Sequence, residues 1–176
     1  MVKILLFAVL SFVVFCNFAM AQEAEFVGVK KCKMCHNKES LGKQYELWTK
    51  EKHSQAYKVL GTPKAKELAT KMGVKENPQE SGKCLKCHVT AYNFTEKRVS
   101  TKITLEEGIS CESCHGAGSL YSKEDIMKKF QAACSKGLNV NPKEVCKKCH
   151  NPESPTYKEF NYDKFFKEIA HPIPQK

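Results

Sequence analysis

The chain is 176 residues long and carries 29 Lys and Arg residues against 19 Asp and Glu residues, a formal net charge of +10. This length is that of one ordinary domain and argues against a multidomain protein. A lysine-rich chain with few aliphatic residues cannot easily fill a hydrophobic core, so we expect disulfides or a bound group to supply the missing stabilisation.

The first 21 residues have the pattern of an export signal. Lys3 provides a positive charge, the run 4–18 is almost wholly apolar, and Ala-Met-Ala at 19–21 forms the small-x-small pattern that precedes cleavage. We therefore expect a mature, exported or periplasmic chain of residues 22–176, from which Cys16 has been removed with the signal. The alternative is an uncleaved anchor, but roughly 15 apolar residues fall short of the ~20 that span a bilayer.

The first part of the mature chain combines a cysteine motif with helical patterns. Cys32-Lys-Met-Cys35-His36 precedes the stretch QYELWTKEKHSQAYKVL (44–60), which predicts a helix with His53 on its apolar face. A second helix is predicted to begin at a Thr62 cap followed by proline and to end before Gly73.

The middle of the chain holds two more motifs of the same type. Cys84-Leu-Lys-Cys87-His88 is followed by 94–105, the only stretch with strand character, which we expect to form one arm of a hairpin. The third motif lies within GISCESCHGAG (108–118), and Ser122 is predicted to open a helix that carries Met127.

The last part contains the fourth motif, Cys146-Lys-Lys-Cys149-His150, entered through a helix start at Asn141. A final short helix is predicted from an Asn161 cap, and Pro172 ends it directly after His171.

All four motifs read Cys-x-x-Cys-His, and in an exported chain this pattern indicates covalent attachment of haem c. Two cysteines three apart add to the two vinyl groups of one porphyrin, and the next histidine binds the iron. Zinc sites and a disulfide framework are the alternatives, but neither requires a histidine after every cysteine pair. The predicted attachment thiols are Cys32, Cys35, Cys84, Cys87, Cys111, Cys114, Cys146 and Cys149, and the predicted proximal iron ligands are His36, His88, His115 and His150.

Four haems would themselves form the core of so small a chain. We therefore predict a mostly α fold with irregular loops and little β structure, wrapped around four stacked covalent haems, whose apoprotein does not fold stably. Haem propionates offset much of the positive charge, so the charge does not indicate nucleic-acid binding.

Only two histidines lie outside the motifs, His53 and His171, and both are predicted distal iron ligands. At most two haems then have two histidine ligands. Met127 is the strongest non-histidine candidate for a sixth ligand. Cys134 is interpreted as a small buried residue, with an axial thiolate or an intermolecular link as the alternatives.

The order of Cys-x-x-Cys-His, WTKEKHSQAY, CLKCHVT, GISCESCHGAG and a final Cys-x-x-Cys-His resembles the cytochrome c554 family of tetrahaem cytochromes over nearly the whole mature chain. The resemblance implies a helical fold, closely stacked haem pairs, electron transfer, and a mixture of bis-histidine and five-coordinate irons. His53 matches the family's distal histidine. Longer members have a histidine soon after CESCHGPG, where this chain has Tyr121, so Tyr121 or Met127 is expected over that iron.

The function predicted from these residues is single-electron transfer between a redox donor and acceptor in the periplasm. No other catalytic constellation stands out. The alternative is a small redox enzyme that reduces nitric oxide, nitrite or a similar small ligand at a five-coordinate haem. No stable membrane span is expected after cleavage of the signal.

Overall fold

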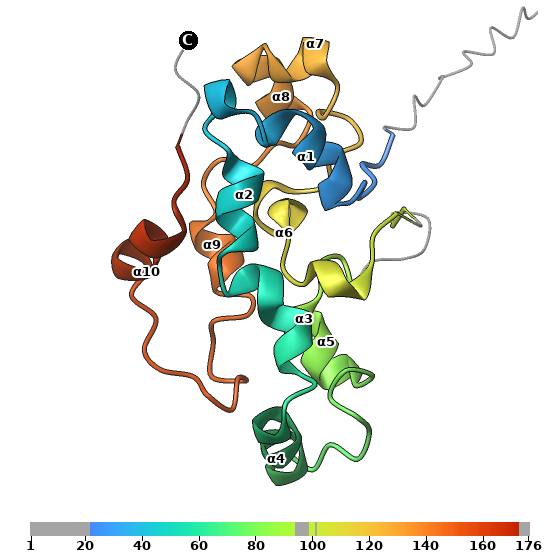
Figure 1. Cartoon of the computed structure of the whole chain (residues 1–176), viewed down its shortest axis with the longest axis vertical. Helices are drawn as coiled ribbons and strands as arrows, with labels where there is room; N and C mark the ends of the chain where they lie inside the picture. The colour runs from blue at the N-terminus through green and yellow to red at the C-terminus, as the bar shows by residue number, and fades with distance from the viewer. Residues whose placement is uncertain (1–21, 94–98, 101, 173–176) are drawn as a thin grey trace, which may run out of the picture.

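Short helices and irregular loops make up the computed structural model, which describes residues 22–93, 99–100 and 102–172 (Figure 1). The described residues form no strand, and their isolated β-bridge is a parallel one between Phe26 and Val99. The predicted mostly helical fold class is confirmed. The expected hairpin arm falls partly on residues 94–98 and 101, outside the described ranges, and at Val99 the chain pairs with the N-terminal segment instead.

The helices follow one another in a column (Figure 1), with α4 at one end and α1, α7 and α8 at the other. The α-helices are α1 (Val29–His36), α2 (Gln44–Thr49), α3 (Ala56–Val59), α4 (Pro63–Lys71), α5 (Gly82–His88), α6 (Cys111–His115), α7 (Glu124–Met127), α8 (Phe130–Ser135), α9 (Lys143–Cys146) and α10 (Tyr162–Ile169). Short 3₁₀-helices cover Glu39–Leu41, His53–Gln55 and Leu105–Glu107.

The stretch predicted as one helix around His53 is broken into α2, a 3₁₀ turn and α3. The break follows Thr49, where the Ser54 hydroxyl donates hydrogen bonds to the carbonyls of Thr49, at 3.1 Å, and Glu51, at 2.8 Å. A serine hydroxyl that binds nearby carbonyls competes with the helical pattern. His53 therefore sits on a turn rather than in the middle of a long helix.

Two predicted helix starts are confirmed by their capping bonds. The Thr62 hydroxyl accepts the amide of Ala65 at 3.2 Å ahead of α4, and the Asn161 side chain accepts the amide of Lys164 at 3.0 Å ahead of α10. By contrast, α7 and α9 begin without a side-chain cap, so the expected Ser122 cap is wrong.

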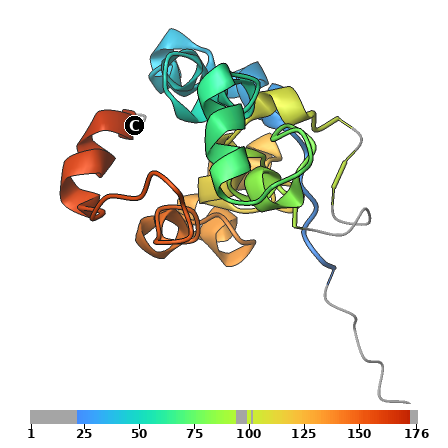
Figure 2. The ribbon, with the colours of Figure 1, turned by 90° about the horizontal axis from the view of Figure 1, so that it is seen from below.

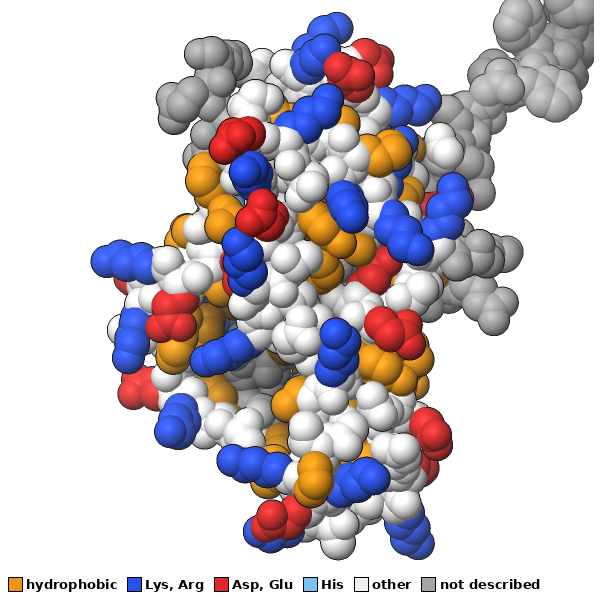
Figure 3. Space-filling view, in the orientation of Figure 1, with side chains coloured by type: hydrophobic (Ala, Val, Ile, Leu, Met, Phe, Trp, Pro, Cys, Tyr) orange, Lys and Arg blue, Asp and Glu red, His pale blue; other side chains and the backbone are white. Residues whose placement is uncertain are grey.

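The described residues bury few large aliphatic side chains. Leu60, Leu85 and Val89 form a small cluster where α3 meets α5, whereas Met34 and Phe130 remain 60% and 59% exposed. Viewed from below, α10 and the arm before it stand apart from the column (Figure 2), and the space-filling view is hollowed between that arm and the column (Figure 3). The side chains of the described residues therefore do not fill the interior of the molecule.

Lysine side chains spread over the face seen in Figure 3, with acidic side chains between them. Several lysines pair with a carboxylate within one helical turn, as Lys50 does with Glu46 and Lys128 with Glu124, both at 2.7 Å. Such exposed pairs stabilise little. None of the helices in the described ranges is long and apolar enough to cross a bilayer.

Candidate haem-binding sites

Each Cys-x-x-Cys-His motif lies in or beside a short helix. We call the motifs sites 1 to 4 in chain order. α1 ends at His36 and α5 at His88, while α6 spans the third motif. α9 ends at Cys146, and one more turn leads to His150, whose amide bonds to the Cys146 carbonyl at 2.9 Å. Residues three and four positions apart share a helix face, so the two thiols and the imidazole of each site lie together.

The described cysteines are all free thiols and all half-buried, including Cys134 on α8. Within the described ranges, no group of three or more His, Cys, Asp or Glu side chains is arranged to hold a metal ion. Neither the disulfide framework nor the zinc clusters weighed from the sequence are therefore found there. The thiols are available for thioether bonds.

The two histidines outside the motifs each face a motif histidine. The rings of His53 and His150 have centroids 6.1 Å apart and meet edge to face, and those of His115 and His171 have centroids 5.9 Å apart. These four side chains come from the turn before α3, from site 4, from site 3 and from the segment after α10. Tertiary structure thus brings His53 to site 4, rather than to the first motif that precedes it in sequence.

The spacing of each pair fits one metal ion between two imidazoles. Metal–nitrogen bonds of roughly 2.0–2.1 Å to histidine put the two nitrogen atoms about 4 Å apart, and half a ring on either side brings the centroids to about 6 Å. The donor sets at sites 3 and 4 therefore fit an iron with two histidine ligands.

Burial keeps these imidazoles in the form that binds a metal. It lowers the pKa of His53, His115 and His150, and the neighbouring imidazole of each pair lowers the pKa of His53 and His115 further. A histidine must be neutral to coordinate a metal. These side chains are thus prepared for ligation at neutral pH.

Backbone carbonyls orient two of the motif histidines. His88 Nδ1 donates to the Ala56 carbonyl at 2.6 Å, and His115 Nδ1 donates to the Asn139 carbonyl at 2.7 Å. A histidine that donates from Nδ1 presents Nε2 to the metal, and the bond holds the ring at one angle. His150 is held differently, by stacking on Phe160 at a centroid separation of 4.7 Å.

Thiols of different motifs lie against one another. The Cys32 thiol of site 1 hydrogen-bonds to the Cys111 thiol of site 3, and this contact raises the pKa of Cys32 and lowers that of Cys111. At sites 2 and 4, burial and the neighbouring Cys87 thiol raise the pKa of Cys149 to about 12. Site 1 therefore adjoins site 3, and site 2 adjoins site 4.

A further contact links the pair of sites 1 and 3 to the pair of sites 2 and 4. Burial and the nearby Cys146 thiol raise the pKa of Cys114 to about 11, so site 3 also adjoins site 4. The spatial order of the motifs is 1, 3, 4, 2, which differs from their order in the chain.

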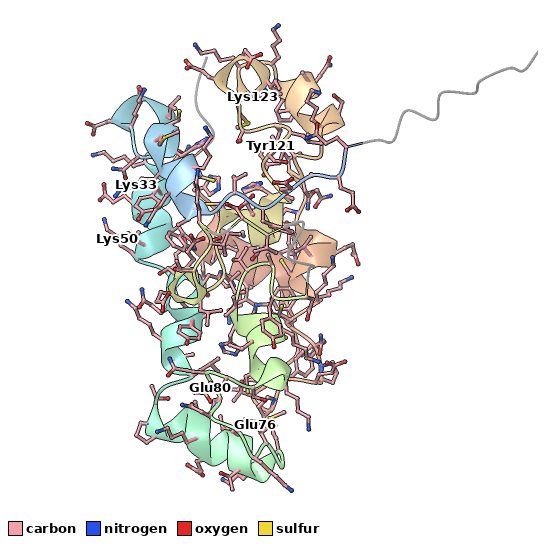
Figure 4. The ribbon with its side chains drawn as sticks, turned by 90° about the vertical axis from the view of Figure 1, so that its right-hand side faces the viewer. Lys33, Lys50, Glu76, Glu80, Tyr121 and Lys123 are labelled. Carbon is pink, nitrogen blue, oxygen red and sulfur yellow. The ribbon has the colours of Figure 1, made fainter. Side chains whose placement is uncertain are left out.

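Among the described residues, neither His36 nor His88 makes a ring contact with another histidine, although His36 lies near enough to His115 to lower the pKa of that residue. The Tyr121 hydroxyl donates to the Gly116 carbonyl at 2.7 Å, and the residue is 6% exposed. Tyr121 lies near α1 and α7 at one end of the molecule, whereas Glu76 and Glu80 mark the other end (Figure 4). Met127 is half-buried at the end of α7.

An open apolar cavity of about 430 Å³ lies beside site 2. The segment that follows His88 provides Val89 and Tyr92 to its wall, and Ile103 and Leu105 lie on the wall as well.

Sequence patterns did not reveal two buried carboxylates that join site 1 to site 3. Glu112, inside the third motif and fully buried, accepts the amides of Val27, at 2.9 Å, Gly28, at 2.8 Å, and Gly118, at 2.7 Å. Glu107 accepts the Val29 amide at 3.0 Å. Together they bind the start of α1 to the segment that carries site 3. No spacing rule marks a glutamate between two cysteines as a structural ligand of distant amides.

Comparison with known proteins points to c-type cytochromes. A family model described as "Cytochrome c554 and c-prime" matches residues 31–116. Cytochrome c-554 of Nitrosomonas europaea is 30% identical over 137 residues, which is 74% of this chain and 54% of that protein. The chain thus spans about half the length of this relative.

A solved structure is also similar. The reduced state of cytochrome c554 from Nitrosomonas europaea aligns with a TM-score of 0.55 and 26% identity, over 84% of this chain and 79% of that one. The chain is therefore similar to the cytochrome c554 family over residues 31–116 and to cytochrome c554 of Nitrosomonas europaea over most of its own length.

Proposed function

We propose that this protein is a periplasmic electron carrier with four covalent haems, produced by cleavage of residues 1–21 and folded from residues 22–176. The observation that carries this proposal is the two pairs of facing histidines, with ring centroids 6.1 and 5.9 Å apart, and each pair includes the histidine of a Cys-x-x-Cys-His motif. Similarity to the cytochrome c554 family supports covalent haem and electron transport.

The order of the motifs supports a continuous relay. Thiol contacts link Cys32 to Cys111 and Cys87 to Cys149, with Cys114 beside Cys146 in between. Each haem supplies a reversible one-electron Fe(III)/Fe(II) couple. The chain would arrange four such centres in the order 1, 3, 4, 2, so that an electron enters at one end of the column and leaves at the other.

The polypeptide would hold each centre rigid. His115 with His171, and His150 with His53, would hold the iron at the two inner sites. Rigid bis-histidine ligation lets iron change its charge with little movement of its ligands. Buried, neutral imidazoles need no proton transfer when the electron arrives.

Met127 is the candidate sixth ligand at site 1. α7 lies near this site, because the Lys128 amino group interacts with Cys35, and Lys38 interacts with Glu124 of α7. Tyr121 is the weaker candidate, since its hydroxyl already donates to a carbonyl.

A mass spectrum of the exported protein tests the proposal. Produced with haem maturation machinery, the protein should have the mass of the chain from Gln22 plus four haem groups. It should also titrate in four one-electron steps. Fewer haems would overturn the tetrahaem assignment, and an N-terminus at Met1 would overturn the cleaved signal.

Reduction of a small ligand at site 2 is a second candidate function. No ring contact pairs His88 with another described histidine, and the segment that follows it, from Val89 to Tyr92, lines the cavity of about 430 Å³. Carbon monoxide or nitric oxide added to the reduced protein should then shift the Soret band of one haem. If no haem responds, this function is excluded. If one does, turnover with nitric oxide or nitrite distinguishes an enzyme from a carrier.

A further inference from the structure

We propose that Gln44 is a positioning residue that couples two haem sites: it orients the proximal His36 of site 1 and fixes the segment that presents His171 to site 3. This inference rests on the proposed function, because it requires haem at both sites. It assigns a role to a residue that is neither an iron ligand nor part of a haem motif.

The local backbone places Gln44 between these two sites. Gly42 (φ +90°) and Lys43 (φ 49°) both have left-handed conformations, and Gln44 follows as the first residue of α2. A side chain other than glycine at position 42 would be strained and would come within 3.0 Å of Pro172. This tight turn therefore packs directly against the segment after α10.

Gln44 is 8% exposed, and both ends of its side-chain amide form hydrogen bonds. Its oxygen accepts from His36 Nδ1 at 3.3 Å, and its nitrogen donates to the carbonyls of Pro172, at 2.9 Å, and Leu41. A buried amide with all these partners has one orientation, because a flip would place oxygen against two carbonyls and nitrogen against the imidazole N–H.

His36 differs from His88 and His115 in the group that accepts the hydrogen bond from its Nδ1. His88 and His115 donate to backbone carbonyls, which no substitution of a side chain can change. The Nδ1 of His36 instead bonds to a side chain. A hydrogen-bond acceptor at Nδ1 raises the basicity of a ligating histidine and fixes its ring. Gln44 can thus tune the electron affinity of the haem at site 1.

The other end of the amide acts on site 3. Pro172 directly follows His171, whose ring lies 5.9 Å from that of His115. His171 is exposed and lies beyond the end of α10, so no helix fixes it. The Gln44–Pro172 bond and the packing of Gly42 against Pro172 are contacts that hold this segment near site 3.

Two substitutions separate the two roles. Gln44→Glu keeps an acceptor for His36 and removes the donor to Pro172. Gln44→Met has similar length and removes both. Gln131, exposed on α8, provides matched controls, Gln131→Glu and Gln131→Met. All variants are produced as holoprotein, and haem content is measured first.

A spectroscopically monitored redox titration reads the effect on site 1. Gln44→Met should make reduction of one haem more favourable by about tenfold, which is ~59 mV for a one-electron couple. Gln44→Glu should shift the same haem in the opposite direction, because a carboxylate is a stronger acceptor. If the role of Gln44 were merely structural, both variants would shift the potential of this haem in the same direction. That result would overturn the proposal.

Electron paramagnetic resonance reads the effect on site 3. Both Gln44 variants should lose part of the low-spin signal of one bis-histidine haem, and added imidazole should restore it. Gln131 variants should match the wild type in both measurements. Unchanged potentials and spin states in Gln44 variants with four haems would refute the role of Gln44 alone, whereas a wild-type protein with fewer haems would refute the proposed function.

Discussion

His53 and His150 meet edge to face with ring centroids 6.1 Å apart, although one follows the first haem motif and the other ends the last. The contact joins the α2–α3 column to the arm before α10. If an iron lies between the two rings, the same bond that completes the haem at site 4 also holds the two halves of the chain together.

Replacing His53 with alanine should convert the haem at site 4 from six-coordinate low-spin to five-coordinate high-spin, because no other described histidine faces His150. Absorption and electron paramagnetic resonance spectra should show the change in one haem only, and added imidazole should reverse it. A spectrum like that of the wild type would show that His53 is not the ligand.

His171→Ala should produce the same change at site 3, where His171 faces His115. The double variant with His53→Ala should then lack both bis-histidine signals. If the two single variants instead remove the same signal, the assignment of one histidine to each site is wrong.

Met127→Leu tests the sixth ligand at site 1. Because Met127 lies in α7 near that site, loss of its thioether should open the iron and allow carbon monoxide to bind to one additional reduced haem. Met34→Leu is the control, since Met34 is 60% exposed within the first motif. An unchanged number of binding haems would exclude Met127 as a ligand.

Glu112→Gln should destabilise the holoprotein by about 1–3 kcal/mol, the usual cost of leaving buried hydrogen-bonding groups unsatisfied. The carboxylate accepts three backbone amides, and an amide side chain would turn an N–H₂ group toward at least one of them. Thermal unfolding followed at the Soret band measures the loss. The exposed Glu67→Gln substitution on α4 serves as the control and should change the midpoint little.

The stability of the protein should depend on pH through Glu107. Burial raises the pKa of Glu107 above its usual value of 4.5, and the neighbouring Glu112 raises it further. The folded state then holds the proton more tightly than the unfolded state, so the contribution of this group to stability falls as pH rises from about 4.5 through the folded pKa. One carboxylate oxygen, Oε1, has no hydrogen-bond partner in the described structure.

Glu107→Gln should remove this contribution. Haem propionates and other carboxylates titrate in the same range, so the measurement is the difference between variant and wild type in denaturant unfolding at several pH values. That difference should favour the variant increasingly as pH rises. A constant difference across the range would contradict a raised pKa at Glu107.

The sequence alone was sufficient for the haem chemistry and the class of fold. Four Cys-x-x-Cys-His motifs indicate covalent haem through their local spacing, because residues three and four positions apart share a helix face whatever surrounds them. Capping at Thr62 and Asn161 is equally local, and both helices begin where expected. The helix predicted through His53 failed because a local competitor, the Ser54 hydroxyl, binds the carbonyls at the break.

Tertiary structure decided which sites are neighbours and which histidine faces which. No periodicity predicts that His53 lies opposite His150, or that Cys32 touches Cys111, because such contacts depend on how loops of irregular length return across the molecule. The same holds for Gln44 and Glu112, whose partners lie in remote segments. Local spacing predicts the groups that would bind haem, whereas only the path of the chain in space determines how these groups are paired.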